Sequence, residues 1–184
     1  MNIPFNVSYH FDENLHEVPN APDDMKAAIA FLQDQLDQTE ATEKLTILGL
    51  IGSYSRILKE FETARGALNT AIALSQTLGS AQSELANQIR LAHVEQWHRN
   101  FENSDRTFAQ IVDRCQNFPE LSHYLDFAYQ HAGKNFFDQS RYFEAYQLFE
   151  KALKLRQLKG DSALIESTQL ALDATRNRLI SYQF

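Results

Sequence analysis

A spacing of small and large side chains that recurs along the chain constrains its fold more than any other feature. Gly133 is followed by Tyr142, Ala145, Phe149 and Ala152, at intervals of nine, three, four and three residues. Steps of three and four place the last four residues on one stripe of an α-helix. The stretch from 133 to 155 therefore predicts the end of one helix, a polar turn and a second helix.

The same offsets occur twice upstream. The matching residues are Phe61, Ala64, Leu68 and Ala71, counted from Gly52, and Phe101, Ser104, Phe108 and Ile111, counted from Ala92. In the second set, Ser104 and Ile111 take the places of the two alanines. The three starting points lie 40 and 41 residues apart. A fixed period in this range indicates a stacked array of helical repeats.

These residues resemble the tetratricopeptide repeat (TPR). The first helix of that family's repeat pairs an apolar with a small residue, as at Ile51-Gly52, Leu91-Ala92 and Ala132-Gly133. Its second helix carries the aromatic, small, large apolar and small residues described above. The resemblance spans roughly residues 45 to 182 and implies an all-α fold. That fold would be a right-handed superhelix of antiparallel helix pairs, with about eight helices in about three and a half repeats.

The sequence also departs from the family pattern. The aromatic residue three places after the glycine is kept as Phe136 but replaced by Ser55 and Glu95. The positions of the closing proline hold Gln76, Gln116 and Gln157. The period exceeds the usual ~34 residues and overlaps the ~40 to 47 of HEAT and armadillo repeats. The small-residue contacts favour the TPR, with longer helices or turns accounting for the extra length.

Turn signals support the register of the repeats. Gly79-Ser80 and Gly160-Asp161 are two periods apart, and each predicts a left-handed helix stop followed by an N-cap. We expect a single helical domain over 23–184. Its predicted helices span about 23–38, 42–59, 61–78, 80–99, 101–117, 119–137, 139–159 and 161–181. The last helix is expected to cover the final pair with Leu164, Ile165, Leu170 or Ala171, and Leu179.

Residues 1–22 form an acidic N-terminal tail that precedes the repeats. Ile3, Phe5, Val7, Tyr9 and Phe11 alternate with mostly polar residues, which is the period of an extended segment. Two outcomes stay open at this stage. The tail either docks, on its own repeats or on a neighbour's, or remains flexible.

Charge and composition exclude several classes of function. Residues 1–24 carry five acids and no Lys or Arg, so the remaining residues account for only −2 of the net charge of −7. We therefore expect no nucleic-acid partner. No apolar run approaches the ~20 residues that span a bilayer, and the start of the chain does not resemble a secretory signal. We expect a cytoplasmic protein with no membrane association.

The residues show no catalytic or metal-binding pattern. His93 and His98 are one residue too far apart to share a metal on one helical face. The single cysteine, Cys115, is expected to be a buried small residue. Phosphate-binding loops and nucleophile elbows are not found in the sequence. We therefore predict no enzyme activity, no cofactor and no metal.

The resemblance implies a concave groove, formed by the first helix of each repeat, that binds a peptide. The family's groove positions correspond to Gly49, Ser53, Arg56, Ile57, Ile89, His93, Gln96, Trp97, Phe127, Gln130, Lys134, Phe137 and Asp138. The candidates with binding chemistry are Arg56, His93, Gln96, Trp97, Gln130, Lys134 and Phe137. Trp97 is either an anchor for the peptide or packed between helices. Gly49 and Ser53 stand where clamps for chaperone tails use Lys and Asn, which argues against that partner.

Three functions stay open. The leading prediction is a non-catalytic scaffold that binds a peptide, tail or helix of a partner protein in the groove. The alternative is an assembly subunit that forms a homodimer through its tail or its repeat ends. A weaker alternative is a sensor of a peptide or small molecule.

Overall fold

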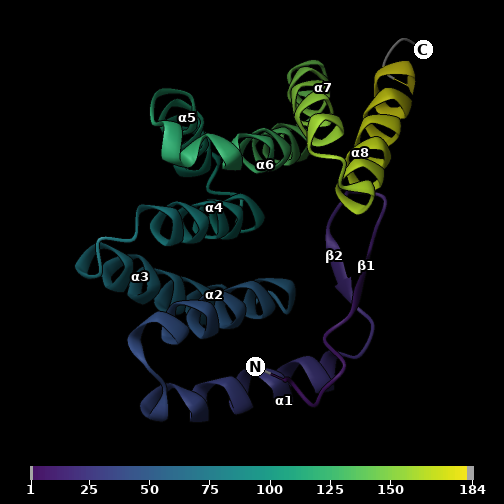
Figure 1. Cartoon of the computed structure of the whole chain (residues 1–184). Coiled ribbons are helices and arrows are strands. Elements are labelled where there is room, and N and C mark those ends of the chain that lie inside the picture. The colour runs from purple at the N-terminus through teal and green to yellow at the C-terminus, as the bar shows by residue number, and fades with distance from the viewer. Residues whose placement is uncertain (1, 182–184) are drawn as a thin grey trace. The chain divides into compact units, whose positions relative to one another are not determined.

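The protein folds into eight α-helices over residues 2–181, which are the residues that the computed structural model describes (Figure 1). The helices are α1 (Pro22–Gln35), α2 (Ala41–Ile57), α3 (Phe61–Thr77), α4 (Ala81–Trp97), α5 (Phe101–Asn117), α6 (Leu125–Asp138), α7 (Tyr142–Lys159) and α8 (Ser162–Ser181). The short elements are the strands β1 (Tyr9–Phe11) and β2 (Glu17–Pro19) and the 3-10 helices η1 (Leu36–Gln38) and η2 (Pro119–Tyr124). The predicted all-α fold is confirmed. Met1 and residues 182–184, at the limits of the expected ranges 1–22 and 23–184, lie outside the described residues.

An even step between helix starts underlies the predicted period. Helices α2 to α5 begin at positions 41, 61, 81 and 101, and each is 17 residues long. Positive φ angles recur in the turns, at Lys59 (63°), Gly79 (65°), Arg99 (63°), Ser140 (60°) and Gly160 (74°). The left-handed stops predicted at Gly79 and Gly160 are confirmed, and Ser80 caps α4 by accepting a hydrogen bond from the Ser83 amide. One repeat period is therefore two helix-and-turn units.

The turn between α5 and α6 breaks this regularity. The position that would take a positive φ is Pro119, whose ring restricts φ to about −65°. Phe118 is extended instead (φ −114°, ψ 108°), and η2 precedes the α-helix. The prediction of a helix beginning at 119 is therefore wrong for its first turns, because α6 begins at Leu125.

By its contacts the chain divides into two compact units. The first contains residues 2–12 and 16–99, and the second contains 13–15 and 100–181. The expected single domain over 23–184 stays a prediction.

Helix packing in the first unit depends on the small residues of the repeat. A Cβ added to Gly52 would lie 2.4 Å from Cγ of Leu68, so only glycine allows α2 this close to α3. Ala64 and Leu68 of α3 then pack against Val94 of α4. On the other side, α1 covers α2 by packing Ile29 and Leu32 on it.

The second unit repeats this packing. A Cβ added to Gly133 of α6 would lie 2.6 Å from the Phe149 ring of α7. Phe149 also packs with Ala171 and Leu172 of α8. Of the two candidates at the final stripe, Ala171 is buried whereas Leu170 is 49% exposed. Helix α8 thus covers the last pair with Ala171 and Leu172 rather than with Leu170.

A buried ion pair joins three helices of the second unit. The Arg156 Nε atom donates to Asp126 at 3.1 Å, and Nη1 donates to Thr168 at 2.7 Å. Lys159 donates to the other Asp126 oxygen. Burial lowers the pKa of Arg156, and the bond to Asp126 opposes that shift. The cluster joins α7 to α6 by charge and α7 to α8 by the hydrogen bond to Thr168.

Candidate functional site

The N-terminal segment is ordered and lies against the helices. We call residues 2–20 the strap. Strands β1 and β2 pair antiparallel, with Tyr9 opposite Pro19 and Phe11 opposite Glu17. The Asp12 amide donates to the His16 carbonyl and the Asp12 carboxylate accepts in return from the His16 amide. The sequence predicted the extended conformation but not the hairpin.

The start of the strap packs on α1. The rings of Phe5 and Phe31 meet edge to face, with centroids 6.1 Å apart. Ile3 adds to the apolar cluster between α1 and α2. The Asn6 amide donates to the Asp24 carboxylate at 3.2 Å. The aromatic and aliphatic side chains at the start of the tail therefore have partners within this unit.

The strongest polar contact of the strap is a buried ion pair between Glu17 and Arg56. Nη1 and Nη2 of Arg56 donate to the two oxygens of Glu17, at 3.0 and 3.2 Å. Both side chains are only 7% exposed. A two-pronged guanidinium–carboxylate contact of this kind is strong and geometrically specific. Arg56 also lies in the last turn of α2, where a cation complements the negative end of the helix dipole.

Trp97, the single tryptophan, lies beneath the strap at the end of α4. The His16 ring stacks on it, with centroids 4.5 Å apart and planes at 30°. The Arg56 Cζ atom lies 4.4 Å from the indole centroid, within the range of a cation–π contact. His93 meets the indole edge to face at 5.8 Å. We call the surface formed by Tyr54, Arg56, His93 and Trp97 the strap face.

Two tyrosines at the strap are partly buried. Burial raises the pKa of Tyr9, and the Glu17 carboxylate raises it further while Arg56 opposes the shift. Burial also raises the pKa of Tyr54, with a smaller contribution from Tyr9. Tyr9 itself is 46% exposed, so these shifts mark a partly covered edge of the site around the ion pair.

The strap face leaves the indole N–H of Trp97 unsatisfied. Trp97 is 9% exposed, and its indole N–H has no acceptor among the residues that the structure describes. A buried donor without a partner costs about 1–3 kcal/mol. The strap therefore fills the face without completing its hydrogen bonds.

All seven predicted groove candidates are buried in the structure. Arg56, His93 and Trp97 come together at the strap face. Gln96, the residue before Trp97 on α4, is also buried. Gln130, Lys134 and Phe137 lie on α6 in the second unit. Phe137 packs in the cluster of Phe149 and α8. The assignment of the seven residues to a peptide groove stays a prediction.

Most of the predicted packing residues are buried. Ten are buried, namely Gly52, Ala64, Leu68, Ala71, Ala92, Phe108, Gly133, Ala145, Phe149 and Ala152. Phe61, Phe101 and Tyr142, the aromatic residues that open each second helix, are half-buried.

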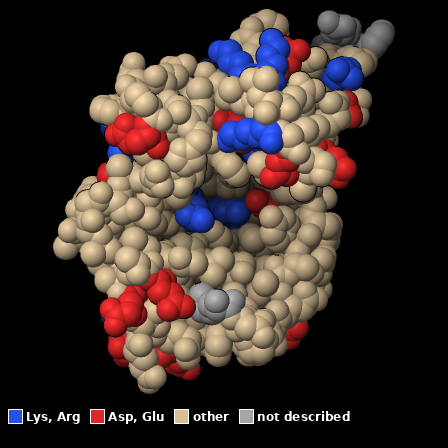
Figure 2. Space-filling view, in the orientation of Figure 1, with Lys and Arg blue, Asp and Glu red and all other residues tan. Residues whose placement is uncertain are grey.

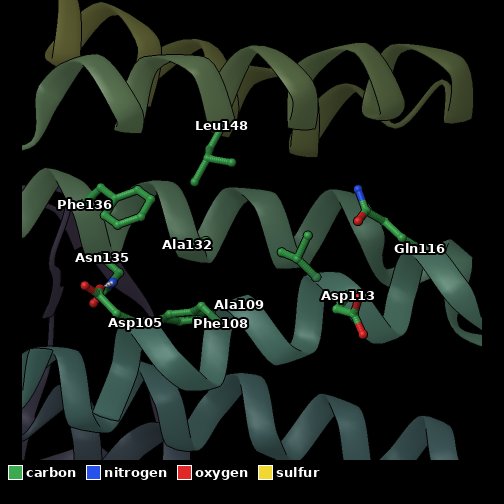
Figure 3. Close-up of a pocket in the computed structure, with 10 residues that line it drawn as sticks. Asp105, Phe108, Ala109, Asp113, Gln116, Ala132, Asn135, Phe136 and Leu148 are labelled. Carbon is green, nitrogen blue, oxygen red and sulfur yellow. Dashed lines mark hydrogen bonds between the residues drawn. The ribbon is translucent and has the colours of Figure 1, made fainter. Parts of the chain in front are cut away.

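A pocket of about 300 Å³ opens between α5, α6 and α7 in the second unit (Figure 3). Its wall is mainly apolar, with Phe108, Phe136 and Leu148 among its lining residues. Its polar lining is engaged within the protein: Asp105 accepts from Gln139 and Arg141, and Gln116 donates to Tyr129. Ligand sites usually offer a few convergent polar groups that fix orientation. This pocket therefore gives less support to a function than the strap face does.

Other chemistry is not indicated by the described residues. They contain no group of three metal-ligating side chains, and within 2–181 no helix is long and apolar enough to cross a membrane. His98 contacts Phe61 and Arg65 rather than the surroundings of His93. Cys115 is buried, and this burial raises its pKa to about 11.

Comparisons with known proteins agree with this architecture. No family model and no curated protein matches the sequence. Among solved structures, BtubC (BKLC) from P. vanneervenii is similar with a TM-score of 0.66 and 17% identity, over 87% of this chain and 68% of that one. The apo form of RapI gives 0.66 and 14%, over 89% and 60%. A putative kinesin light chain from Podosopora anserina, with nearly identical TPR-like repeats, gives 0.57 and 14%, over 88% and 82%.

At sequence identities of 14% to 17%, these comparisons establish the fold alone. The protein has a TPR-like repeat fold, so the resemblance inferred from the spacing of small and aromatic residues is confirmed at that level.

Proposed function

We propose that the protein is a non-catalytic scaffold that binds an extended segment of a partner protein on the strap face. The observation that carries this proposal is the strap itself. A stretch of extended chain, His16 to Pro19, already lies on α2 and α4 through the Glu17–Arg56 pair and the His16–Trp97 stack. A face that accommodates one extended segment has the dimensions and chemistry to accommodate another.

The chemistry of the face resembles that of peptide-binding sites in general. Such sites combine a buried aromatic anchor with a few directed polar contacts. Trp97 supplies the anchor, and Arg56 supplies a planar cation that suits a carboxylate. Repeat folds commonly bind extended partners in this way. The expected cytoplasmic location and absence of enzyme activity stay predictions.

The test uses the full chain carrying Glu17→Gln, in which the strap has lost its charged contact. A fluorescently labelled peptide of residues 8–20 is added, and binding is followed by anisotropy. We expect saturable binding. Adding Trp97→Ala to the same chain should weaken binding at least tenfold, because the anchor is removed.

Leu158→Ala is the matched control, since Leu158 is 85% exposed on α7 of the second unit. This change should leave peptide affinity unaltered. Circular dichroism must show that each variant keeps its helices. A folded Glu17→Gln chain that does not bind the peptide would reject the proposed function.

A further inference from the structure

We infer that the strap is a built-in competitor for the strap face, and that the partner which displaces it is an extended acidic segment carrying a carboxylate at the position of Glu17. This inference rests on the proposed function and specifies its partner and its regulation. It follows from three properties of the strap: its incomplete hydrogen bonding, its short hairpin and its charge.

Incomplete hydrogen bonding gives a partner an advantage. The His16 ring of the strap stacks on the Trp97 indole, and the indole N–H has no acceptor among the described residues. An external segment that places a carbonyl or carboxylate oxygen there satisfies this donor. Since an unsatisfied buried donor is costly, such a segment binds the face more favourably than the strap does.

The hairpin within the strap is also short. Its two strands are three residues each and pair with one another, within a segment that is mostly exposed or half-exposed. A two-stranded hairpin of this size is at best marginally stable alone. The contacts of Glu17 and His16 therefore carry much of its attachment to α2 and α4, and displacing them frees the face.

The charge of the partner follows from Arg56. The Arg56 side chain is 7% exposed, and its charge is neutralised by Glu17. Removing one member of a buried pair leaves an uncompensated charge, which is strongly unfavourable. A displacing segment must therefore bring its own carboxylate to Arg56, and a neutral or basic segment leaves that charge unpaired.

Broad attraction does not explain this preference. Acidic side chains gather over the turn between α1 and α2 in the same unit (Figure 2), where the chain carries Asp34, Asp37, Glu40 and Glu43. Long-range electrostatics near this turn would repel an acidic segment. The preference for acid is therefore a local property of the Arg56 site.

The experiment compares two full-length chains with two labelled peptides. The chains are wild type and Glu17→Gln, and the peptides are residues 8–20 with Glu or Gln at position 17. We expect the Glu peptide to bind the Glu17→Gln chain at least tenfold more tightly than wild type, because the strap competes in wild type. We expect the Gln peptide to bind the Glu17→Gln chain at least tenfold more weakly than the Glu peptide does.

Glu13→Gln is the matched control chain. It removes one carboxylate from the strap at an exposed position and leaves the Glu17–Arg56 pair intact. Its affinity for the Glu peptide should equal that of wild type. Release of the strap is measured separately by the emission of Trp97, which should shift to longer wavelength in Glu17→Gln and not in Glu13→Gln.

The outcomes separate this inference from the proposed function. Equal, measurable binding to wild type and Glu17→Gln would overturn the competition while leaving the face a peptide site. Equal binding of the Glu and Gln peptides would overturn the acidic partner. A Glu17→Gln chain that becomes dimeric by light scattering would show that the freed strap occupies a second copy, which overturns the assignment to a partner protein. Lack of binding to both chains would overturn both proposals.

Discussion

Gly52 shows at the scale of one residue how this fold limits side-chain size. The space that its Cβ would need is already taken by Leu68. Gly66, on α3 in the same unit, has no heavy atom within 4 Å of an added Cβ. The two glycines therefore have opposite roles, the first in packing and the second at an open helical position.

Alanine at these two glycines should change stability in opposite directions. Gly52→Ala should lower the free energy of unfolding by about 1–3 kcal/mol, the usual cost of overpacking. Gly66→Ala should raise it by about 0.5–1 kcal/mol, because alanine favours a helix interior. Urea denaturation followed by circular dichroism measures both. A destabilised Gly66→Ala, or an unaffected Gly52→Ala, would contradict the packing described.

Asp126 is the residue on which the buried cluster of the second unit depends. Asp126→Asn would leave Arg156, 2% exposed, without its counter-charge. We expect a loss of about 3–5 kcal/mol in the free energy of unfolding. The control is Asp173→Asn, whose partner Arg176 is 54% exposed. That change should alter stability by no more than about 1 kcal/mol, and similar melting temperatures for the two variants would refute the contrast.

Sequence reasoning succeeded where an interaction repeats and failed where it occurs once. Gly52 and Gly133 have the same offsets to Leu68 and Phe149, so their packing could be found from spacing. Glu17 and Arg56 lie far apart in the chain, and nothing distinguishes Glu17 from the other carboxylates of the tail. The sequence could therefore nominate Arg56 and Trp97 but not their occupant. The alternation of apolar and polar residues in the tail indicated an extended segment, but it did not indicate where that segment docks.

At the scale of the element, the turns decide where each helix stops. The chain takes a positive φ after α2, α3, α4, α6 and α7, whether or not the residue is glycine. A non-glycine residue in this conformation is disfavoured by about 1–2 kcal/mol. Lys59, Arg99 and Ser140 adopt it nonetheless, each in the turn between two helices. Pro119 cannot adopt it, because the proline ring restricts φ to about −65°, so the helix boundary there could not be predicted from helical periodicity alone.

Exchanging residue types in two of these turns tests this account. Gly160→Ala, at φ 74° and with nothing within 4 Å of its Cβ, should lower the free energy of unfolding by about 1–2 kcal/mol through backbone strain alone. Lys59→Gly, at φ 63°, should raise it by up to about 1 kcal/mol, because relief of strain outweighs the extra entropy that glycine loses on folding. Thermal melts compare the two. Equal shifts in the same direction would show that strain does not govern these turns.

At the scale of the whole chain, the strap brings distant residues together. His16, near the start of the chain, stacks on Trp97 at the end of α4, and Glu17 reaches Arg56 at the end of α2. Contacts between residues this far apart in sequence close long loops. The entropy lost on closing each loop is offset here by few interactions. We therefore expect the strap to open far more often than the helices on which it lies.

Hydrogen–deuterium exchange measures this difference. Amides of β1 and β2 should exchange well before those in the middle of α2 and α4, because local opening requires few contacts to break. Glu17→Gln should accelerate exchange in the strap, whereas Glu13→Gln should not. Equal protection of strap and helices would mean that the strap is an integral part of the core.

The even step between helix starts has a consequence for how such a chain can lengthen. Each step adds one helix and reverses the direction of the chain, so consecutive helices alternate in role. Inserting a single step would turn every later first helix into a second helix and place Gly133 at the position that Ile72, Val112 and Leu153 hold in the second helices, where a large apolar residue stands. A viable duplication must therefore comprise two steps, so a coding sequence in such a lineage would grow by whole helix pairs and never by one helix.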